Sequence, residues 1–123
     1  MRLLLIVPAA TLLFTAPAAL AKSTEFQLNE TSWTFVRDKL KMRETIDAKG
    51  NYIQNQMSGK HVDHGTAVMK DGKACFTSAM NSDGERCWTV KPVAIGHAMT
   101  AVSDKGEKLV VTRTKYMPLK MPK

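Results

Sequence analysis

Two histidines and an aspartate stand together in one short stretch, at His61, Asp63 and His64. Imidazole nitrogens and carboxylate oxygens are common metal ligands, so this stretch has the residue types of a metal site. Side chains alternate between the two faces of a β-strand, which puts His61 and Asp63 on one face and His64 on the other. Because Val62 and Val68 mark the apolar side, we expect His64 to point inward and the other two outward. Three side chains divided in this way cannot converge on one ion.

A metal site would therefore need ligands from elsewhere in the chain. Zinc takes a third and usually a fourth ligand, and the remaining histidine, His97, forms an H-x-M pair with Met99. Thioether and imidazole groups suit copper. The candidate ligands for copper or zinc are His61, Asp63, His97 and Met99. The alternative is structural: Asp63 pairs with a lysine or with His61, His64 donates to a carbonyl inside the fold, and methionine fills gaps.

The motifs of the common catalytic folds are missing from the sequence. The chain has no G-x-S-x-G nucleophile turn, no phosphate-binding glycine loop and no EF-hand calcium loop. Most of its aspartates stand in turn-like clusters or beside lysines, where they favour turns rather than the facing carboxylates of glycoside cleavage. We therefore expect a protein that is not an enzyme and has no cofactor, with bound copper or zinc as the alternative.

The first residues have the pattern of a secretory signal. Arg2 precedes an uncharged, mostly apolar run, and Ala19-Leu20-Ala21 is a small-x-small cleavage site. We expect cleavage after Ala21 and a bacterial protein that is periplasmic or secreted, with no membrane span in the mature chain. Cys75 and Cys87 are the only cysteines, and in an exported protein a lone pair predicts a disulfide. Closing so short a loop stabilises a fold by about 3 kcal/mol.

Clusters of turn-forming residues recur every ~8–12 residues after Trp33, a spacing typical of all-β sandwiches and barrels. Between them lie short segments rich in β-branched and aromatic residues, and short turns make neighbouring strands antiparallel. We predict an all-β fold, a small antiparallel up-and-down barrel of about eight strands with a filled interior. A two-sheet sandwich is the alternative. The predicted strands are 32–36, 41–46, 51–57, 61–69, 74–79, 86–90, 94–102 and 108–116.

The predicted domain organisation follows from these elements. It consists of a signal peptide at 1–21, a lead-in segment at 22–31 with a possible short helix, the β domain at 32–116 and a flexible basic tail at 117–123. Burial of Phe76 and Trp88 would place Cys75 and Cys87 on the outer face by alternation. The predicted core consists of Trp33, Phe35, Ile46, Tyr52, Val62, Val68, Phe76, Trp88, Leu109 and Val111.

The chain carries a formal net charge of +7, spread along its length. Such a charge favours acidic partners, so we expect a secreted or envelope protein or an acidic envelope polymer, and no nucleic acid. The alternative is that the lysines only protect turns and strand edges. Three polar loops near the predicted disulfide are candidate binding loops, and their residues are Lys70, Asp71, Lys73, Asp83, Arg86 and Lys105.

Four short motifs resemble those of known proteins: Gly50-x-Tyr52, His61-Val-Asp-His-Gly65, Lys70-Asp-Gly-Lys73-x-Cys75-Phe-Thr77 and Cys87-Trp-Thr89. Over most of residues 33–116 the chain resembles small exported alphaproteobacterial proteins of unknown function. Because no activity is established for those proteins, the resemblance implies no site residues. In size, export signal, single disulfide and strand pattern it is also similar to periplasmic β-barrel inhibitors of proteases and lysozyme. This second similarity is architectural, since Ser58-Gly59-Lys60-His61-Val62 does not match the S-G-x-x-Y loop of one lysozyme-inhibitor family.

The sequence therefore predicts a non-catalytic periplasmic or secreted binding protein. Its expected partner is a protein or an envelope component, and inhibition of a secreted hydrolase is one specific form of this function. A periplasmic protein that binds copper or zinc is the alternative.

Overall fold

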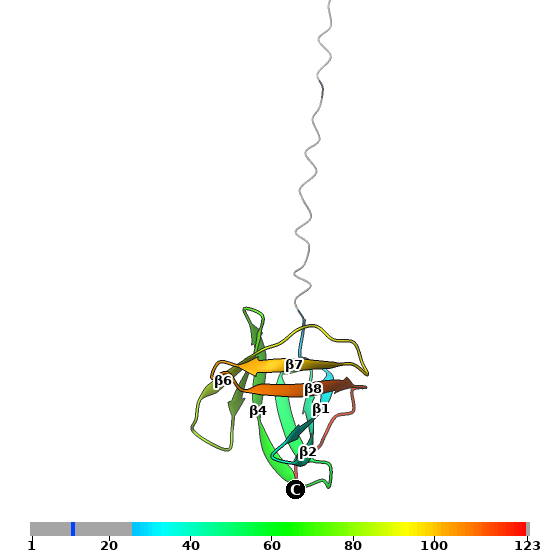
Figure 1. Cartoon of the computed structure of the whole chain (residues 1–123), viewed down its shortest axis with the longest axis vertical. Helices are drawn as coiled ribbons and strands as arrows, with labels where there is room; N and C mark the ends of the chain where they lie inside the picture. Colours follow the sequence, from blue (N-terminus) through cyan, green and yellow to red (C-terminus); the bar gives the residue numbers. More distant parts are fainter. Residues whose placement is uncertain (1–10, 12–25, 123) are drawn as a thin grey trace, which may run out of the picture.

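The computed structural model describes Thr11 and residues 26–122, so the predicted signal peptide, apart from Thr11, and residues 22–25 lie outside the described residues. Eight antiparallel strands pair in sequence order, and β8 pairs with β1 to close a barrel (Figure 1). No helix in this described part is long and apolar enough to cross a membrane. The strands are β1 (Thr31–Arg37), β2 (Leu40–Ile46), β3 (Asn51–Gln56), β4 (His61–Lys70), β5 (Lys73–Ser78), β6 (Glu85–Thr89), β7 (Ala98–Ser103) and β8 (Lys108–Thr114).

The predicted up-and-down barrel is confirmed, and the sandwich alternative is wrong. Observed strand ends agree with the predicted ones to within two residues, except that β7 begins four residues late, at Ala98. A turn that the sequence pattern did not reveal precedes it. The His97 amide donates to the Ala94 carbonyl, and Gly96 has a φ of 88°. A left-handed glycine redirects the chain at this point, so the extended conformation starts only after it.

The direction of the strands gives the barrel two different ends. The turns after β1, β3, β5 and β7 lie at one end, which we call the open end. The turns after β2, β4 and β6 lie at the other, which we call the plugged end. Leu28 is buried there, and Phe26 packs edge-on against Trp33 with the ring centroids 5.9 Å apart. The short helix predicted for 22–31 is absent from 26–30; Phe26 and Leu28, two positions apart, both reach the core as in extended chain.

The C-terminal tail runs back along the barrel wall. The Met117 amide donates to Ser32 Oγ at 2.9 Å, and the Leu119 amide donates to Thr45 Oγ1 at 3.1 Å. Residues 117–122 have no regular secondary structure. The segment predicted as a flexible tail is therefore held against β1 and β2 at these two points.

Most of the predicted core faces the barrel interior, but two valines do not. Val62 and Val68 are 38% and 47% exposed, so their assignment to the core is wrong. The β4 side chains opposite the interior rings are small: Tyr52 pairs with Gly65 and Phe76 pairs with Ala67. The centroids of the Tyr52 and Phe76 rings lie 5.3 Å apart. Small residues on β4 leave the space that these two rings occupy, and the valines are turned outward.

We predict that Gly65→Ala disrupts the barrel at this point. Its Cβ would lie 2.0 Å from the Thr77 carbonyl oxygen of the neighbouring strand. The backbone of β5 cannot move away from this Cβ unless β4 and β5 separate. We therefore expect a loss of stability of about 3 kcal/mol, as for severe overpacking. Gly106→Ala is the control, since Gly106 has a φ of 86° and open space around it, and its cost is backbone strain of ~1–2 kcal/mol. Urea denaturation of both variants checks this, and equal losses would contradict it.

Candidate functional site

The interior of the barrel is not completely filled. A narrow slot remains, with a cavity volume of about 70 Å³, roughly half that of an apolar cavity of ~150 Å³ that binds benzene. Its lining extends from Leu28 at the plugged end to Arg37 at the end of β1. Trp33 and Trp88, the two tryptophans of the chain, both line it. The filled interior predicted from the sequence therefore needs one correction: packing leaves a thin, mainly apolar channel along the barrel.

A polar pocket adjoins this slot toward the open end. The two share Arg37, Gln54 and Phe76 in their linings, and the polar pocket adds Asp63 and Arg86, among others. We call this polar pocket the mouth. The shared residues place the slot and the mouth side by side, with the apolar space within and the polar one toward the open end.

Both arginines at the mouth have exposed ion-pair partners. Arg37 lies 3.8 Å from Glu107, and Arg86 lies 3.1 Å from Asp83, with all four side chains more than a third exposed. The Arg37 guanidinium also lies 5.9 Å from the centroid of the Trp88 ring. Exposed ion pairs stabilise a fold by only ~0–1 kcal/mol, so either guanidinium can exchange its carboxylate for an anionic group of a ligand.

One buried carboxyl group faces the slot. Glu44 is 7% exposed and accepts a hydrogen bond of 2.7 Å from Gln54 Nε2. Burial raises the pKa of Glu44 to about 7, against the smaller lowering effects of the Gln54 bond and of Arg37. At mildly acidic pH this side chain is a neutral hydrogen-bond donor in the wall of the slot. Glu44 was not among the predicted site residues, although alternation with Met42 and Ile46 places it on the inner face of its strand.

Asp63 forms a second buried polar cluster, at the mouth. Its two carboxylate oxygens accept hydrogen bonds from the Tyr52 hydroxyl at 2.8 Å and from Ser78 Oγ at 2.5 Å. Burial, followed by the bond to Asp63, raises the pKa of Tyr52, which keeps the phenol protonated as the donor. Ser78 thus donates to a carboxylate and not to a histidine, so this cluster has no Ser–His pair.

Asp63 points inward and not outward as predicted, because it shares the inner face of β4 with Gly65 and Ala67, and a β-bulge separates it from His61. Gln54 pairs with Asp63, but the next residue of β3, Asn55, pairs with His61, so Val62 is an extra residue on β4. One extra residue shifts the alternation by one position. The shift affects only the residues before Val62, so His61 faces outward, whereas strict alternation from Asp63 would turn it into the barrel.

The same bulge brings the two histidines of the motif together. His61 Nε2 lies 3.0 Å from His64 Nδ1, and His61 Nδ1 lies 2.8 Å from Asn55 Oδ1. The prediction that His64 points inward, away from His61, is wrong. The metal ligands predicted from the sequence do not lie together. His61 follows an open-end turn, His97 stands in the connection at the plugged end, and Met99 lines the slot.

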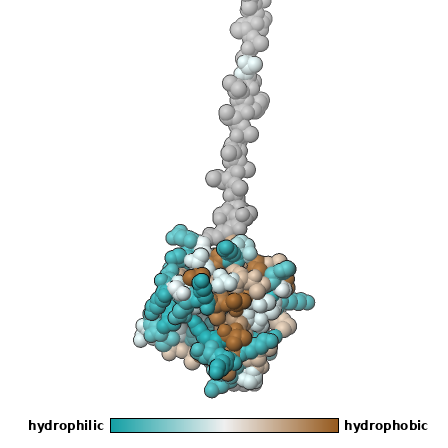
Figure 2. Space-filling model, in the orientation of Figure 1, coloured by the Kyte–Doolittle hydropathy of each residue, from teal (hydrophilic) through white to brown (hydrophobic). Residues whose placement is uncertain are grey.

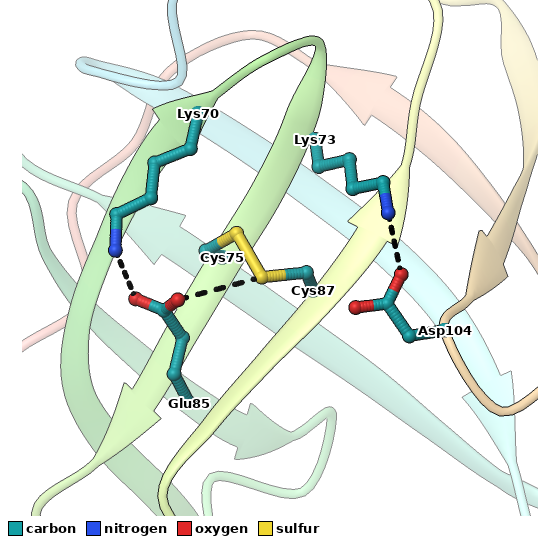
Figure 3. The surroundings of a disulfide bond; sticks show 6 residues. All are labelled: Lys70, Lys73, Cys75, Glu85, Cys87 and Asp104. Carbon is teal, nitrogen blue, oxygen red and sulfur yellow. Dashed lines mark hydrogen bonds and ion pairs between the residues drawn. A yellow bond between two sulfur atoms is a disulfide. The ribbon is translucent and has the colours of Figure 1, made fainter.

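The predicted disulfide between Cys75 and Cys87 is present on the outer face of β5 and β6 (Figure 3). Glu85 Oε1 lies 3.6 Å from Cys87 Sγ. Among the residues that the structure describes, Cys75, Glu85 and Cys87 are the one group of three His, Cys, Asp or Glu side chains with ligand atoms within 4.8 Å of one another. Sulfurs bonded to each other offer no thiolate, so this group does not bind a metal in its oxidised form.

The predicted binding loops lie at both ends of the barrel. Asp71, with a φ of 49°, stands in a turn at the plugged end. Asp83, Arg86 and Lys105 stand in or beside turns at the open end, and of these only Arg86 lines the mouth. Side chains of these loops nevertheless meet beside the disulfide, where Lys70 pairs with Glu85 and Lys73 with Asp104.

The lysines of the first predicted loop serve a structural role beside the disulfide. Lys70 Nζ lies 2.7 Å from Glu85 Oε2, and Lys73 Nζ lies 2.8 Å from Asp104 Oδ1 (Figure 3). The bond to Asp104 raises the pKa of Lys73. These ion pairs cross the outer wall on either side of the disulfide and join β4 to β6 and β5 to the turn after β7.

Exposed apolar side chains gather around the open end. Figure 2 shows an apolar area in the middle of a mostly hydrophilic face. Val36 and Val110, each 59% exposed, line a shallow surface hollow together with Lys41 and Lys108. Other exposed apolar residues in or beside the open-end turns are Leu40, Met57 and Met80. The outside of the open end thus combines apolar side chains with lysines.

No family model, no curated protein and no solved structure matches the chain. Because a barrel fold by itself does not establish a function, we infer the function from the slot, its mouth and the surrounding surface.

We predict that Glu44 makes the stability of the protein depend on pH. Its pKa rises from 4.5 in the unfolded chain to about 7 in the fold. Protonated Glu44 stabilises the fold fully below the pKa of the unfolded chain, and this stabilisation is lost as the pH rises through the pKa of the folded protein. The free energy of unfolding should therefore fall by about 3 kcal/mol between about pH 5 and pH 8.

Urea denaturation at a series of pH values measures this fall. Glu44→Gln should flatten the curve, since the amide does not ionise. Glu107→Gln is the matched control, because Glu107 is exposed, and it should leave the curve unchanged. A wild-type stability that is constant or rises over this range would contradict the prediction.

Proposed function

We propose that this protein is a non-catalytic periplasmic or secreted binding protein that takes up one acyl chain of an anionic envelope lipid. The observation that carries the proposal is an apolar slot along the barrel that adjoins a mouth with two arginines. At about 70 Å³ the slot holds the end of a linear chain, and a longer acyl chain enters it only when the side chains of its wall move apart. Each methylene that leaves water for the slot contributes about 0.8 kcal/mol.

The charges at the mouth favour a negatively charged head group. Arg37 and Arg86 line the mouth with two guanidinium groups, whose exposed carboxylate partners, Glu107 and Asp83, a ligand anion would displace; the oxygens of Asp63 already accept two hydrogen bonds. Glu44 adds no negative charge while it is protonated. Guanidinium groups bind phosphate and carboxylate oxygens through paired, charge-assisted hydrogen bonds. The head group would stay at the mouth while the chain enters the slot.

The surface around the open end supports contact with a lipid layer. Val36 and Val110 with Lys41 and Lys108 combine exposed apolar and basic groups. Such surfaces bind the boundary between anionic head groups and acyl chains. An acyl chain could then pass from the lipid layer into the slot at the same end of the barrel.

The contacts of the reactive side chains support a role without catalysis. Ser78 and Tyr52 donate to Asp63, and His61 and His64 contact each other. The two cysteines are joined in the disulfide. None of these contacts pairs a serine or a cysteine with a histidine.

Tryptophan fluorescence provides the first test, because both tryptophans line the slot. Lauroyl lysophosphatidylglycerol, a single-chain anionic lipid, is titrated below its micelle concentration. We expect a saturable change in emission at one equivalent. The zwitterionic lauroyl lysophosphatidylcholine should bind about tenfold more weakly, a difference of about 1.4 kcal/mol.

Three variants locate the binding site. Ala101→Leu adds three carbon atoms to a slot wall that is 4% exposed, and it should abolish the fluorescence change. Arg37→Gln should remove most of the preference for the anionic lipid. Arg43→Gln is the matched control, since Arg43 lies on the outer face of β2 between the inward-facing Met42 and Glu44.

Several outcomes would contradict the proposal. They are the absence of a saturable response in the wild type, equal affinity for the two lipids, or an equal effect of Arg37→Gln and Arg43→Gln. If Ala101→Leu fails to fold, amide chemical shifts of the lipid-bound wild type decide, and changes confined to the outer surface would exclude the slot. Inhibition of a secreted hydrolase by a protein that binds neither lipid would favour the inhibitor function instead.

A further inference from the structure

A second site lies outside the barrel and does not depend on the slot. His61 and His64 share the outer face of β4 because of the bulge at Val62, and their ring nitrogens face each other at 3.0 Å. Both rings are partly exposed to solvent. We infer that these two histidines bind one copper(II) ion, through Nε2 of His61 and Nδ1 of His64.

The distance between the nitrogens is compatible with both of them as ligands of one ion. Two nitrogens 3.0 Å apart that each lie about 2.0 Å from one ion subtend an angle of about 97° at it. Neighbouring ligands in tetragonal copper(II) subtend about 90°. Tetrahedral zinc requires about 109°, hence a separation of about 3.3 Å between the nitrogens. The observed separation is closer to the value for copper(II) than to that for zinc, and copper(II) also binds nitrogen ligands more strongly than the other divalent metals of its row.

Asn55 sets the protonation of the first ligand. Its Oδ1 lies 2.8 Å from His61 Nδ1, and because an amide oxygen has no hydrogen, Nδ1 of His61 must be the donor. Nε2 of His61 then carries a lone pair directed at His64. This is the arrangement in which a second residue orients a metal-binding imidazole.

The second ligand changes its tautomer when the ion binds. In the metal-free pair, Nδ1–H of His64 donates to Nε2 of His61. The copper ion takes the place of that proton, which moves to Nε2 of His64, so both rings stay neutral and no net proton is released. Each ring must turn by about 40° to aim its lone pair at the ion, by the same triangle of distances. Water occupies the remaining coordination positions.

This site differs from the ligand set predicted from the sequence. Asp63 is turned into the barrel, where both its oxygens are occupied by hydroxyl donors. His97 precedes β7 at the other end of the barrel. The two ligand sets therefore predict opposite effects for His97→Gln.

Calorimetric titration of the purified, disulfide-bonded protein with copper(II) sulfate tests the inference. We expect one equivalent to bind, with a tetragonal electron paramagnetic resonance spectrum that shows two nitrogen ligands. Zinc should bind at least about tenfold more weakly. His61→Gln and His64→Gln should each remove this binding, Asn55→Ala should weaken it about tenfold through loss of the orienting bond, and the control His97→Gln should leave it unchanged.

The inference is overturned if the wild type binds no copper, if His64→Gln binds it normally, or if His97→Gln loses it. A measurement on the wild type does not depend on the folding of any variant. Paramagnetic copper should broaden the amide signals of Asn55 and of residues 61–65 before any others. Broadening that begins instead at residues 97–99 would place the ion elsewhere and exclude the histidine pair.

Discussion

Closure of the barrel by the pairing of β1 with β8 is the constraint on which the rest of the structure depends. Four residue pairs, from Ser32 with Thr114 to Phe35 with Val111, join the first strand to the last. They remove both edges of the sheet and enclose every second side chain. Beyond Phe35 the two strands part toward the open end. The N-terminal segment covers the other end with Leu28. A barrel closed firmly at one end and loosely at the other leaves an interior that solvent and ligands reach from one direction.

Polar and apolar side chains are packed differently in the interior of the barrel. The buried Glu44 accepts from Gln54, and the half-buried Asp63 accepts from Tyr52 and Ser78. The apolar walls, in contrast, leave a slot between them. A buried carboxyl costs stability unless it is protonated or paired, so Glu44 is a group that packing alone would not retain. Local departures of this kind are expected at functional sites, where stability is lost in exchange for a prepared surface.

One extra residue on β4 decides where the two histidines lie. The bulge at Val62 leaves His61 beside His64 on the outer wall, while Asp63 faces the mouth from the inner face that it shares with Gly65 and Ala67. Without the bulge, strict alternation would put His61 inside with Asp63 and separate the histidines. Bulges re-aim side chains near functional sites in many sheets. In this barrel a single local irregularity forms the histidine pair that we propose as a copper site.

The sequence by itself determined the architecture. The regular spacing of its turns is compatible with few folds besides an antiparallel barrel, alternation placed Trp33, Phe35 and Ile46 inside, and a lone pair of cysteines formed the disulfide. Only the tertiary structure decided which side chains of β4 face the interior of the barrel. Hydrophobicity pointed to Val62 and Val68 as core, but the rings of neighbouring strands fill that space, so the small residues face inward. Register and ring volume are properties of strand pairs and not of one strand, which is why local patterns predicted the barrel but not its sites.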